Sequence, residues 1–147
     1  MYNPFTLEKK NIIVTGASGG IGQQVAITCS KMGARVTLIG RNRDRLDETM
    51  HQLEGEGHII VSYDLTNLES IKDMVASIVS KMGVIDGLVN CAGISTILPF
   101  KLMTPEKVDD FFKTNVYASI ELTRQVLNIK NVNKALYSLF HDDINRW

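Results

Sequence analysis

Cysteine and long apolar segments are both scarce in this sequence. Its 147 residues contain two cysteines, Cys29 and Cys91, whose spacing fits neither a disulfide framework nor a metal site. This scarcity predicts a protein without a bound metal in a reducing compartment, the cytoplasm. Residues 1–10 hold no apolar run long enough for a signal peptide, and no segment approaches the ~20 apolar residues of a membrane span. We therefore expect a soluble chain with no membrane partner.

An excess of charge of either sign is also absent. The 16 lysine and arginine residues cancel the 16 aspartate and glutamate residues, and no block of like charge stands out. This balance argues against nucleic acid as a partner and leaves small molecules or protein. With 147 residues the chain has room for one domain with a sizeable core, but not for a nucleotide domain plus a separate substrate domain.

The most informative stretch is residues 11–22, NIIVTGASGGIG, which predicts a strand, a glycine-rich turn and the start of a helix. Gly16 allows a sharp turn off the strand, while Gly20 and Gly22 leave no Cβ where backbone approaches a pyrophosphate and where a helix sits close to a sheet. The helix N-terminus offers unpaired N–H groups to an anion, and Ser18 can add a hydroxyl donor. Structural turns also collect glycine, so this motif needs support from the rest of the chain.

Strands and helices alternate along the chain. The expected strands are residues 12–14, 35–39, 58–64 and 85–90. The segments between them place apolar residues every three to four positions, as helices with one buried face do. This alternation predicts an α/β fold with a parallel sheet, helices on both of its faces and right-handed connections.

The expected helices have recognisable starts and apolar faces. The inward-facing residues of the first helix are expected to be Ile21, Val25, Ala26, Cys29 and Met32. Residues 66–69, TNLE, form a capping-box pattern before the third helix. Thr104 as N-cap and Pro105 at the first helical position predict a long helix that ends near Asn128.

The residues after the second strand bear on the choice of cofactor. In a dinucleotide fold an acidic residue about 20 positions beyond the glycine turn binds the ribose hydroxyls, whereas an arginine accommodates a 2′-phosphate. Gly40 and Arg41 occupy that point, so the sequence predicts NADP(H) in preference to NAD(H). The alternative is that Arg41, Arg43 and Arg45 form a solvated face, although cations are disfavoured at the start of a helix.

Four motifs resemble those of the short-chain dehydrogenase/reductase family. The glycine spacing TG-x-x-x-G-I-G resembles its cofactor signature, and residues 64–65, DL, resemble the pair that contacts the adenine. Residues 90–93, NCAG, are similar to the family's N-N-A-G motif, with Cys91 in place of the second asparagine. Asn115, within KTNVYAS, matches the family's helix asparagine.

The resemblance implies a Rossmann-type fold with a doubly wound parallel sheet, and it assigns the residues of the site. The implied cofactor-binding residues are Gly16, Ser18, Gly20, Ile21, Gly22, Arg41, Asp64, Leu65, Asn90, Ala92 and Gly93. Asn115, the implied catalytic residue, would kink its helix and hold a water molecule in a proton relay. The alternatives are that Asp64 caps a loop and that Asn115 is an ordinary surface residue.

The chain departs from the family near its C-terminal end. Members of the family continue into a fifth strand ending in a serine and a helix bearing Tyr-x-x-x-Lys, whose tyrosine is the general acid or base. Here Tyr137 is followed four residues later by His141, and it comes only 22 residues after Asn115. We therefore predict an NADP(H)-binding domain at residues 1–134 and an atypical tail at 135–147, in which the run ALYSLF could imitate strand five.

Two functions stay open at this point. One is the NADP(H)-binding part of an oxidoreductase, similar to the 3-oxoacyl-ACP reductase-like members of the family, that interconverts a carbonyl and an alcohol. The other is a catalytically inactive nucleotide-binding fragment, such as the truncated or frame-shifted product of a longer gene. The sheet would be incomplete, with about four to five strands and strand four at an open edge, which predicts an aggregating monomer or a homo-oligomer. The family's substrate loop is also absent, so the sequence predicts no substrate.

Overall fold

A four-stranded parallel sheet forms the centre of the molecule. The computed structural model describes residues 5–128. Its strands are β1 (Asn11–Thr15), β2 (Arg35–Gly40), β3 (Ile59–Ser62) and β4 (Gly87–Val89), in the spatial order β3-β2-β1-β4. All three pairings are parallel. The predicted α/β fold with a parallel sheet is confirmed, although β3 and β4 are shorter than expected.

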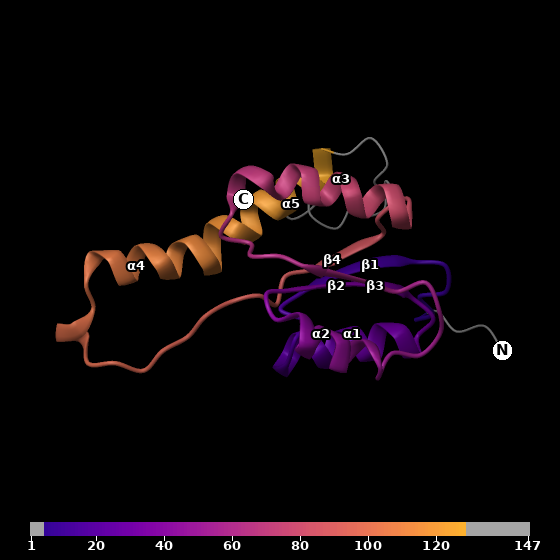
Figure 1. Cartoon of the computed structure of the whole chain (residues 1–147), viewed down its shortest axis with the longest axis horizontal. Coiled ribbons are helices and arrows are strands. Elements are labelled where there is room, and N and C mark those ends of the chain that lie inside the picture. The colour runs from indigo at the N-terminus through magenta and orange to yellow at the C-terminus, as the bar shows by residue number, and fades with distance from the viewer. Residues whose placement is uncertain (1–4, 129–147) are drawn as a thin grey trace.

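Helices cover both faces of this sheet (Figure 1). One layer consists of α1 (Gly20–Lys31) and α2 (Arg43–Met50), and the other of α3 (Ile71–Met82) and α5 (Ala118–Asn128). Successive β1 side chains alternate between the two layers, because Ile12 and Val14 pack with the α1–α2 cluster whereas Ile13 packs with the α3–α5 cluster. The consecutive apolar residues of β1 are therefore explained by a strand that is buried on both sides.

The predicted apolar face of α1 is wrong at Ile21, whereas Ala26 is buried and Val25 and Cys29 pack against the α1–α2 cluster as expected. Ile21 is 77% exposed, whereas the buried residues of the helix are Gly22, Ala26, Ile27 and Ser30. The reason is the close approach of the helix to the glycine turn, since a Cβ on Gly22 would overlap the Gly16 carbonyl oxygen. Gly22 must therefore face the sheet, and Ile21, about 100° earlier around the helix, is turned toward solvent.

The predicted capping box before α3 does not form. The Thr66 hydroxyl donates a hydrogen bond to Oδ1 of Asp64 at 2.7 Å, and the Thr66 N–H donates to the same oxygen at 3.0 Å. The helix begins instead after a short 3-10 turn, η1 (Leu68–Ser70), and neither element has a side-chain N-cap. The apolar face of α3 is as expected, and it buries Ile71, Met74, Val75, Ile78 and Met82.

The expected long helix at residues 105–128 has a wide turn in its middle. It consists of α4 (Pro105–Phe112), a π-helical segment η3 (Lys113–Tyr117) and α5, and a short 3-10 turn, η2 (Phe100–Leu102), precedes it. Thr104 is the N-cap and accepts a hydrogen bond from the Lys107 N–H, as predicted. No helix within residues 5–128 is long and apolar enough to cross a membrane.

The sheet has an open side at β4 within the described range. There β4 pairs with β1 on one side and with no strand on the other. The helix α4 lies beyond the end of the sheet (Figure 1) and buries none of its residues. Tyr137 and the candidate strand at 135–140 lie outside the described residues, so the predicted tail stays a prediction.

Candidate nucleotide-binding site

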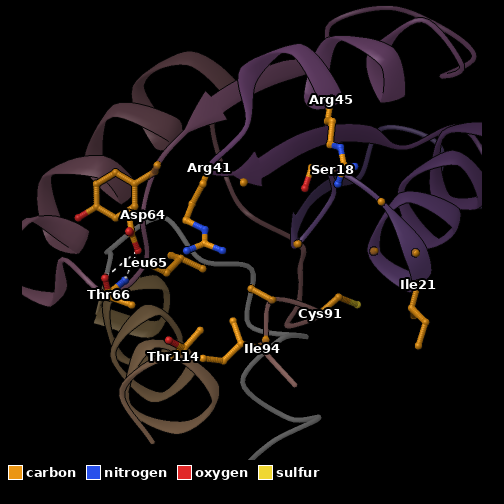
Figure 2. A pocket seen from close by; sticks show the side chains of 18 of the residues that line it. Ser18, Ile21, Arg41, Arg45, Asp64, Leu65, Thr66, Cys91, Ile94 and Thr114 are labelled. Carbon is orange, nitrogen blue, oxygen red and sulfur yellow. Dashed lines mark hydrogen bonds between the residues drawn. The ribbon is translucent and has the colours of Figure 1, made fainter. Parts of the chain in front are cut away.

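A pocket of about 590 Å³ lies at the carboxyl ends of the strands. The chain runs from β1 outward to β2 and β3 and then crosses to β4 on the other side of β1, so the direction of winding reverses between β1 and β4. Ligands of open α/β sheets bind at such a switch point. Most of the lining comes from the turn after β1, the end of β2, the segment after β3 and the segment after β4, and α2 and η3 add one residue each (Figure 2).

The glycine turn after β1 leaves space beside its backbone. A Cβ added to Gly19 or Gly20 would meet no atom within 4 Å, and both residues line the pocket. Gly20 has φ +55° and Gly16 has φ +64°, which is the left-handed region that favours glycine. The first N–H groups of α1 start here, with no side-chain cap from Gly19. A dinucleotide pyrophosphate fits this cradle, because bare backbone and a helix N-terminus face open space.

Gly16 and Gly22 have a different function from that of Gly19 and Gly20. A Cβ on Gly16 would come within 2.8 Å of the Cys91 carbonyl oxygen, and one on Gly22 would overlap the Gly16 carbonyl. These two glycines therefore let the turn, α1 and the segment after β4 approach one another.

Hydrogen bonds join the segment after β4 to Thr15, the last residue of β1, next to the glycine turn. The Thr15 hydroxyl accepts hydrogen bonds from the N–H groups of Cys91 and Ala92, each at 3.0 Å, and donates to the Val89 carbonyl at 3.5 Å. One buried hydroxyl thus places the NCAG segment against the pocket. Asn90 does not line the pocket, because its Nδ2 donates to the Thr123 hydroxyl on α5. The structure thus shows Asn90 joining the end of β4 to α5.

The three arginines after β2 are not equivalent. Arg43 is exposed, pairs with Asp47 at 3.1 Å and does not line the pocket, as a residue of a solvated face would. Arg41 and Arg45 both line the pocket. In Figure 2 Arg41 extends toward Asp64 and Leu65. The solvated-face interpretation therefore describes Arg43 but leaves the other two in the candidate site.

Asp64 has two sets of neighbours at the mouth of the pocket. The Thr66 N–H and then the Thr66 hydroxyl, both hydrogen-bonded to it, hold the pKa of Asp64 below its usual value, and the positive charges of Arg41 and Lys113 lower it further. The carboxylate does cap a loop, as the alternative interpretation held, and it also lines the pocket. Beside it, Tyr63 donates to the Asn67 carbonyl at 2.6 Å, and burial raises the pKa of its phenol.

Asn115 holds the loop that follows Gly93. Its Oδ1 accepts from the Ile94 N–H at 2.7 Å, and its Nδ2 donates to the Ile94 carbonyl at 2.9 Å. Asn115 lies within the π-helical turn, which is where the resemblance placed a kink. Asn115 is exposed, yet both polar atoms of its side-chain amide bond to the loop backbone, so the residue joins η3 to this loop. It does not line the pocket.

Most of the expected cofactor residues meet in this pocket. Those that line it are Gly16, Ser18, Gly20, Ile21, Gly22, Arg41, Asp64, Leu65, Ala92 and Gly93. Sequence reasoning did not assign several further lining residues, among them Tyr63, Thr66, Ile94, Ser95 and Thr114. Tyr63, Thr66 and Ile94 directly adjoin an assigned cofactor-binding motif, and Ser95 follows one closely. Thr114 directly precedes Asn115 in the sequence and lines the pocket from the π-helical segment η3. Among residues 5–128 no group of histidine, cysteine, aspartate and glutamate side chains could hold a metal ion.

Comparison with known proteins gives the same fold. The short chain dehydrogenase family matches residues 10–134. Gluconate 5-dehydrogenase of Gluconobacter oxydans is 39% identical over 116 residues, which are 78% of this chain and 45% of that protein. The citronellol catabolism dehydrogenase of Pseudomonas aeruginosa PAO1 superposes with a TM-score of 0.76 at 31% identity, over 87% of this chain and 53% of that one.

A structure determined with a nucleotide is also similar. Actinorhodin polyketide ketoreductase with NADPH superposes with a TM-score of 0.74 at 28% identity, over 87% of this chain and 49% of that chain. The present chain spans about half the length of the relatives it matches. The family match covers 125 of the 147 residues, from 10 to 134, and it includes every motif that lines the pocket. The chain belongs to the short-chain dehydrogenase family.

Proposed function

We propose that this chain binds NADP(H) in the pocket at the β1–β4 switch point. It would be the cofactor-binding part of an oxidoreductase that interconverts a carbonyl and an alcohol. The observation that carries the proposal is the open space beside Gly19 and Gly20 at the start of α1, in a pocket that also contains Arg41 and Arg45. No carboxylate follows β2 at the position where NAD-binding folds place one, since Gly40 and Arg41 stand there. The similarity to a ketoreductase with NADPH supports the choice.

The pocket offers a binding surface for each part of the dinucleotide. The pyrophosphate would lie on the backbone of the glycine turn, and the phosphate on the adenosine ribose would lie near the arginines. Leu65 is buried beside Asp64 and offers an apolar wall for the base, whose exocyclic amine could donate to the carboxylate. Ala92 and Gly93 would lie along the second ribose. Bound NADPH would supply the hydride.

A second candidate is nucleotide binding without turnover. The sequence contains no Tyr-x-x-x-Lys motif. In addition, the amide oxygen and the amide nitrogen of Asn115 are both already hydrogen-bonded to Ile94. We propose that residues 1–134 form the cofactor domain, and the end of the family match at residue 134 supports this boundary. The cytoplasm and a homo-oligomer are our proposals for compartment and assembly, on the grounds of the two free cysteines and the open side of β4.

Titration of the purified chain with NADPH and with NADH, followed by fluorescence, tests the binding proposal. We expect NADPH to bind more tightly than NADH, and equal affinity would contradict the cofactor preference. An assay of NADPH oxidation with a panel of aldehydes and ketones then separates the two candidates. Turnover supports the oxidoreductase, and saturable binding without turnover supports the second candidate. A folded chain that binds neither nucleotide contradicts both.

A further inference from the structure

We infer that Thr66 is a positioning residue that makes the nucleotide site selective for adenine over a base with an oxo group, such as hypoxanthine. It holds one carboxylate oxygen of Asp64, so that the other oxygen, Oδ2, is left to accept from the exocyclic amine of the base. This inference rests on the proposed function, because it concerns base selectivity in the same pocket. The sequence had placed Thr66 in a capping box before α3 instead.

Thr66 occupies a single oxygen of the Asp64 carboxylate. The Thr66 N–H donates to Oδ1 of Asp64 at 3.0 Å, and the Thr66 hydroxyl donates to the same atom at 2.7 Å (Figure 2). Within residues 5–128 no other donor forms a hydrogen bond with either carboxylate oxygen. A carboxylate oxygen accepts about two hydrogen bonds, so Oδ1 is fully used whereas Oδ2 keeps both of its lone pairs.

The loop that carries both residues is closed on itself. Leu65, which lies between them in the chain, is buried in the α3–α5 cluster and anchors the loop. The Asn67 N–H donates to the Asp64 carbonyl at 3.0 Å, and the Tyr63 hydroxyl donates to the Asn67 carbonyl at 2.6 Å. The carboxylate is therefore oriented before a ligand binds, which lowers the entropic cost of binding.

The charges nearby make this orientation necessary. The positive charges of Arg41 and Lys113 both act on the Asp64 carboxylate, and Figure 2 shows Arg41 extended toward it. The Thr66 N–H and then the Thr66 hydroxyl are the main reasons that the pKa of Asp64 is below its usual value, so the group is a charged acceptor at neutral pH. Without the Thr66 hydroxyl, the carboxylate would keep only the backbone bond and turn more readily toward either cation.

Adenine and hypoxanthine differ at the group that would meet Oδ2 of Asp64. Adenine carries an amine there, which donates a hydrogen bond, whereas hypoxanthine carries an oxo group, which accepts one. An ionised carboxylate oxygen only accepts, so it attracts the amine and repels the oxo group. Asp64, Leu65 and Thr66 all line the pocket, which places this acceptor at the wall proposed for the base. A site that pairs with an N–H group of its ligand rejects an analogue that lacks the group.

The test compares NADPH with its hypoxanthine analogue, reduced nicotinamide hypoxanthine dinucleotide phosphate, by calorimetric titration of the purified chain. We expect the wild-type chain to bind NADPH about tenfold more tightly, which is the effect of one exposed charge-assisted hydrogen bond. Thr66→Val removes the hydroxyl at nearly constant shape, and it should bring this ratio close to one, mainly by weakening NADPH. Thr66→Ser, the matched variant that keeps a hydroxyl, should retain the tenfold ratio.

Asp64→Asn gives a second readout, which a purely structural role of Thr66 would not change. The two Thr66 donors would hold the amide oxygen in the place of Oδ1, so the amide nitrogen would face the base and donate to it. Asp64→Asn should therefore prefer the hypoxanthine analogue, and adding Thr66→Val should abolish that preference.

The same titrations can overturn the inference. If Thr66→Val retains the tenfold ratio, or weakens both nucleotides by the same factor, Thr66 does not set base selectivity and the inference is wrong. If the wild-type chain binds NADPH and its analogue equally, the inference is wrong while nucleotide binding stands. A folded chain that binds neither nucleotide contradicts the proposed function as well. Circular dichroism and thermal unfolding of each variant show whether the fold is intact.

Discussion

β2 and β4 both pair with β1 in one parallel sheet, yet their surroundings are very different. β2 lies between β1 and β3, and the four residues from Val36 to Ile39 are all buried. All three residues of β4 are only half-buried, and within the described residues β4 has a neighbour on one side alone. The same contrast separates α3, which buries five residues, from α4, which buries none. An apolar strand is therefore fully buried only where strands on both sides and helices on both faces cover it.

The pocket spans both regions, and this has a functional consequence. One side of the pocket comes from the densely packed β1–β2 region, where the Thr49 hydroxyl donates a hydrogen bond to the Ala17 carbonyl of the glycine turn. Its other wall comes from the loop after β4, which Asn115 holds through two hydrogen bonds to Ile94. We expect nucleotide binding to tolerate changes at α4 better than changes at the glycine turn.

The largest loss of nucleotide binding is expected where an added Cβ atom would collide with the backbone of the glycine turn. Gly22→Val should abolish nucleotide binding and destabilise the fold, because its Cβ would overlap the Gly16 carbonyl and force α1 off the turn. Gly19→Ala is the matched control, since its backbone is extended and nothing lies within 4 Å of the added Cβ. It should leave the unfolding midpoint unchanged and weaken NADPH by filling the cradle. Thermal unfolding and NADPH titration measure both effects, and a folded Gly22→Val chain with full affinity would contradict the assignment.

A second pair of substitutions measures the contrast between the two strands directly. Leu38→Ala removes a fully buried side chain from β2 and should lower the free energy of unfolding by about 2–5 kcal/mol. Leu88→Ala, on half-buried β4, should cost clearly less, since part of the cavity is open to water. Urea denaturation of both variants gives the comparison. Equal losses would show that β4 is as well covered in solution as β2.

The open side of β4 and the exposed face of α4 predict self-association. Val108 and Phe112 on α4 and Ile120 on α5 are exposed apolar residues. Sedimentation of the purified chain should therefore detect species larger than a monomer, in proportions that increase with concentration. Ile120→Lys should reduce the association without affecting NADPH binding. A monodisperse monomer that melts at ~45–65 °C would show that this surface is covered.

The smallest effect concerns pH. The folded state lowers the pKa of Asp64 below its unfolded value, so the carboxylate contributes stability above the unfolded pKa and loses it as the pH falls through the folded pKa. The contribution is small because Asp64 is largely exposed to solvent. The urea midpoint of the wild-type chain should therefore decrease slightly more on acidification below pH ~4 than that of Asp64→Asn. An identical pH dependence of the two chains would exclude this contribution.

The order of strands and helices followed from the sequence, because apolar spacing and glycine positions are local properties of the chain. Residues 11–22 identified the turn on which the pocket is built, and the N-cap at Thr104 identified the start of α4. The class of fold and the family followed from the same patterns. Each depends on periodicity and turn chemistry, which a sequence displays directly.

The tertiary structure alone decided which side chains face the pocket. The sequence placed Ile21 on the buried face of α1, and contact between Gly22 and the turn rotated it outward. It singled out Arg41 for a phosphate and grouped Arg43 and Arg45 with it only as a solvated face, whereas the structure places Arg45 in the pocket and pairs Arg43 with Asp47. The physical reason is that periodicity fixes the spacing of side chains along an element, whereas the phase of that element and the partners of its polar groups are set by contacts between segments far apart in the chain.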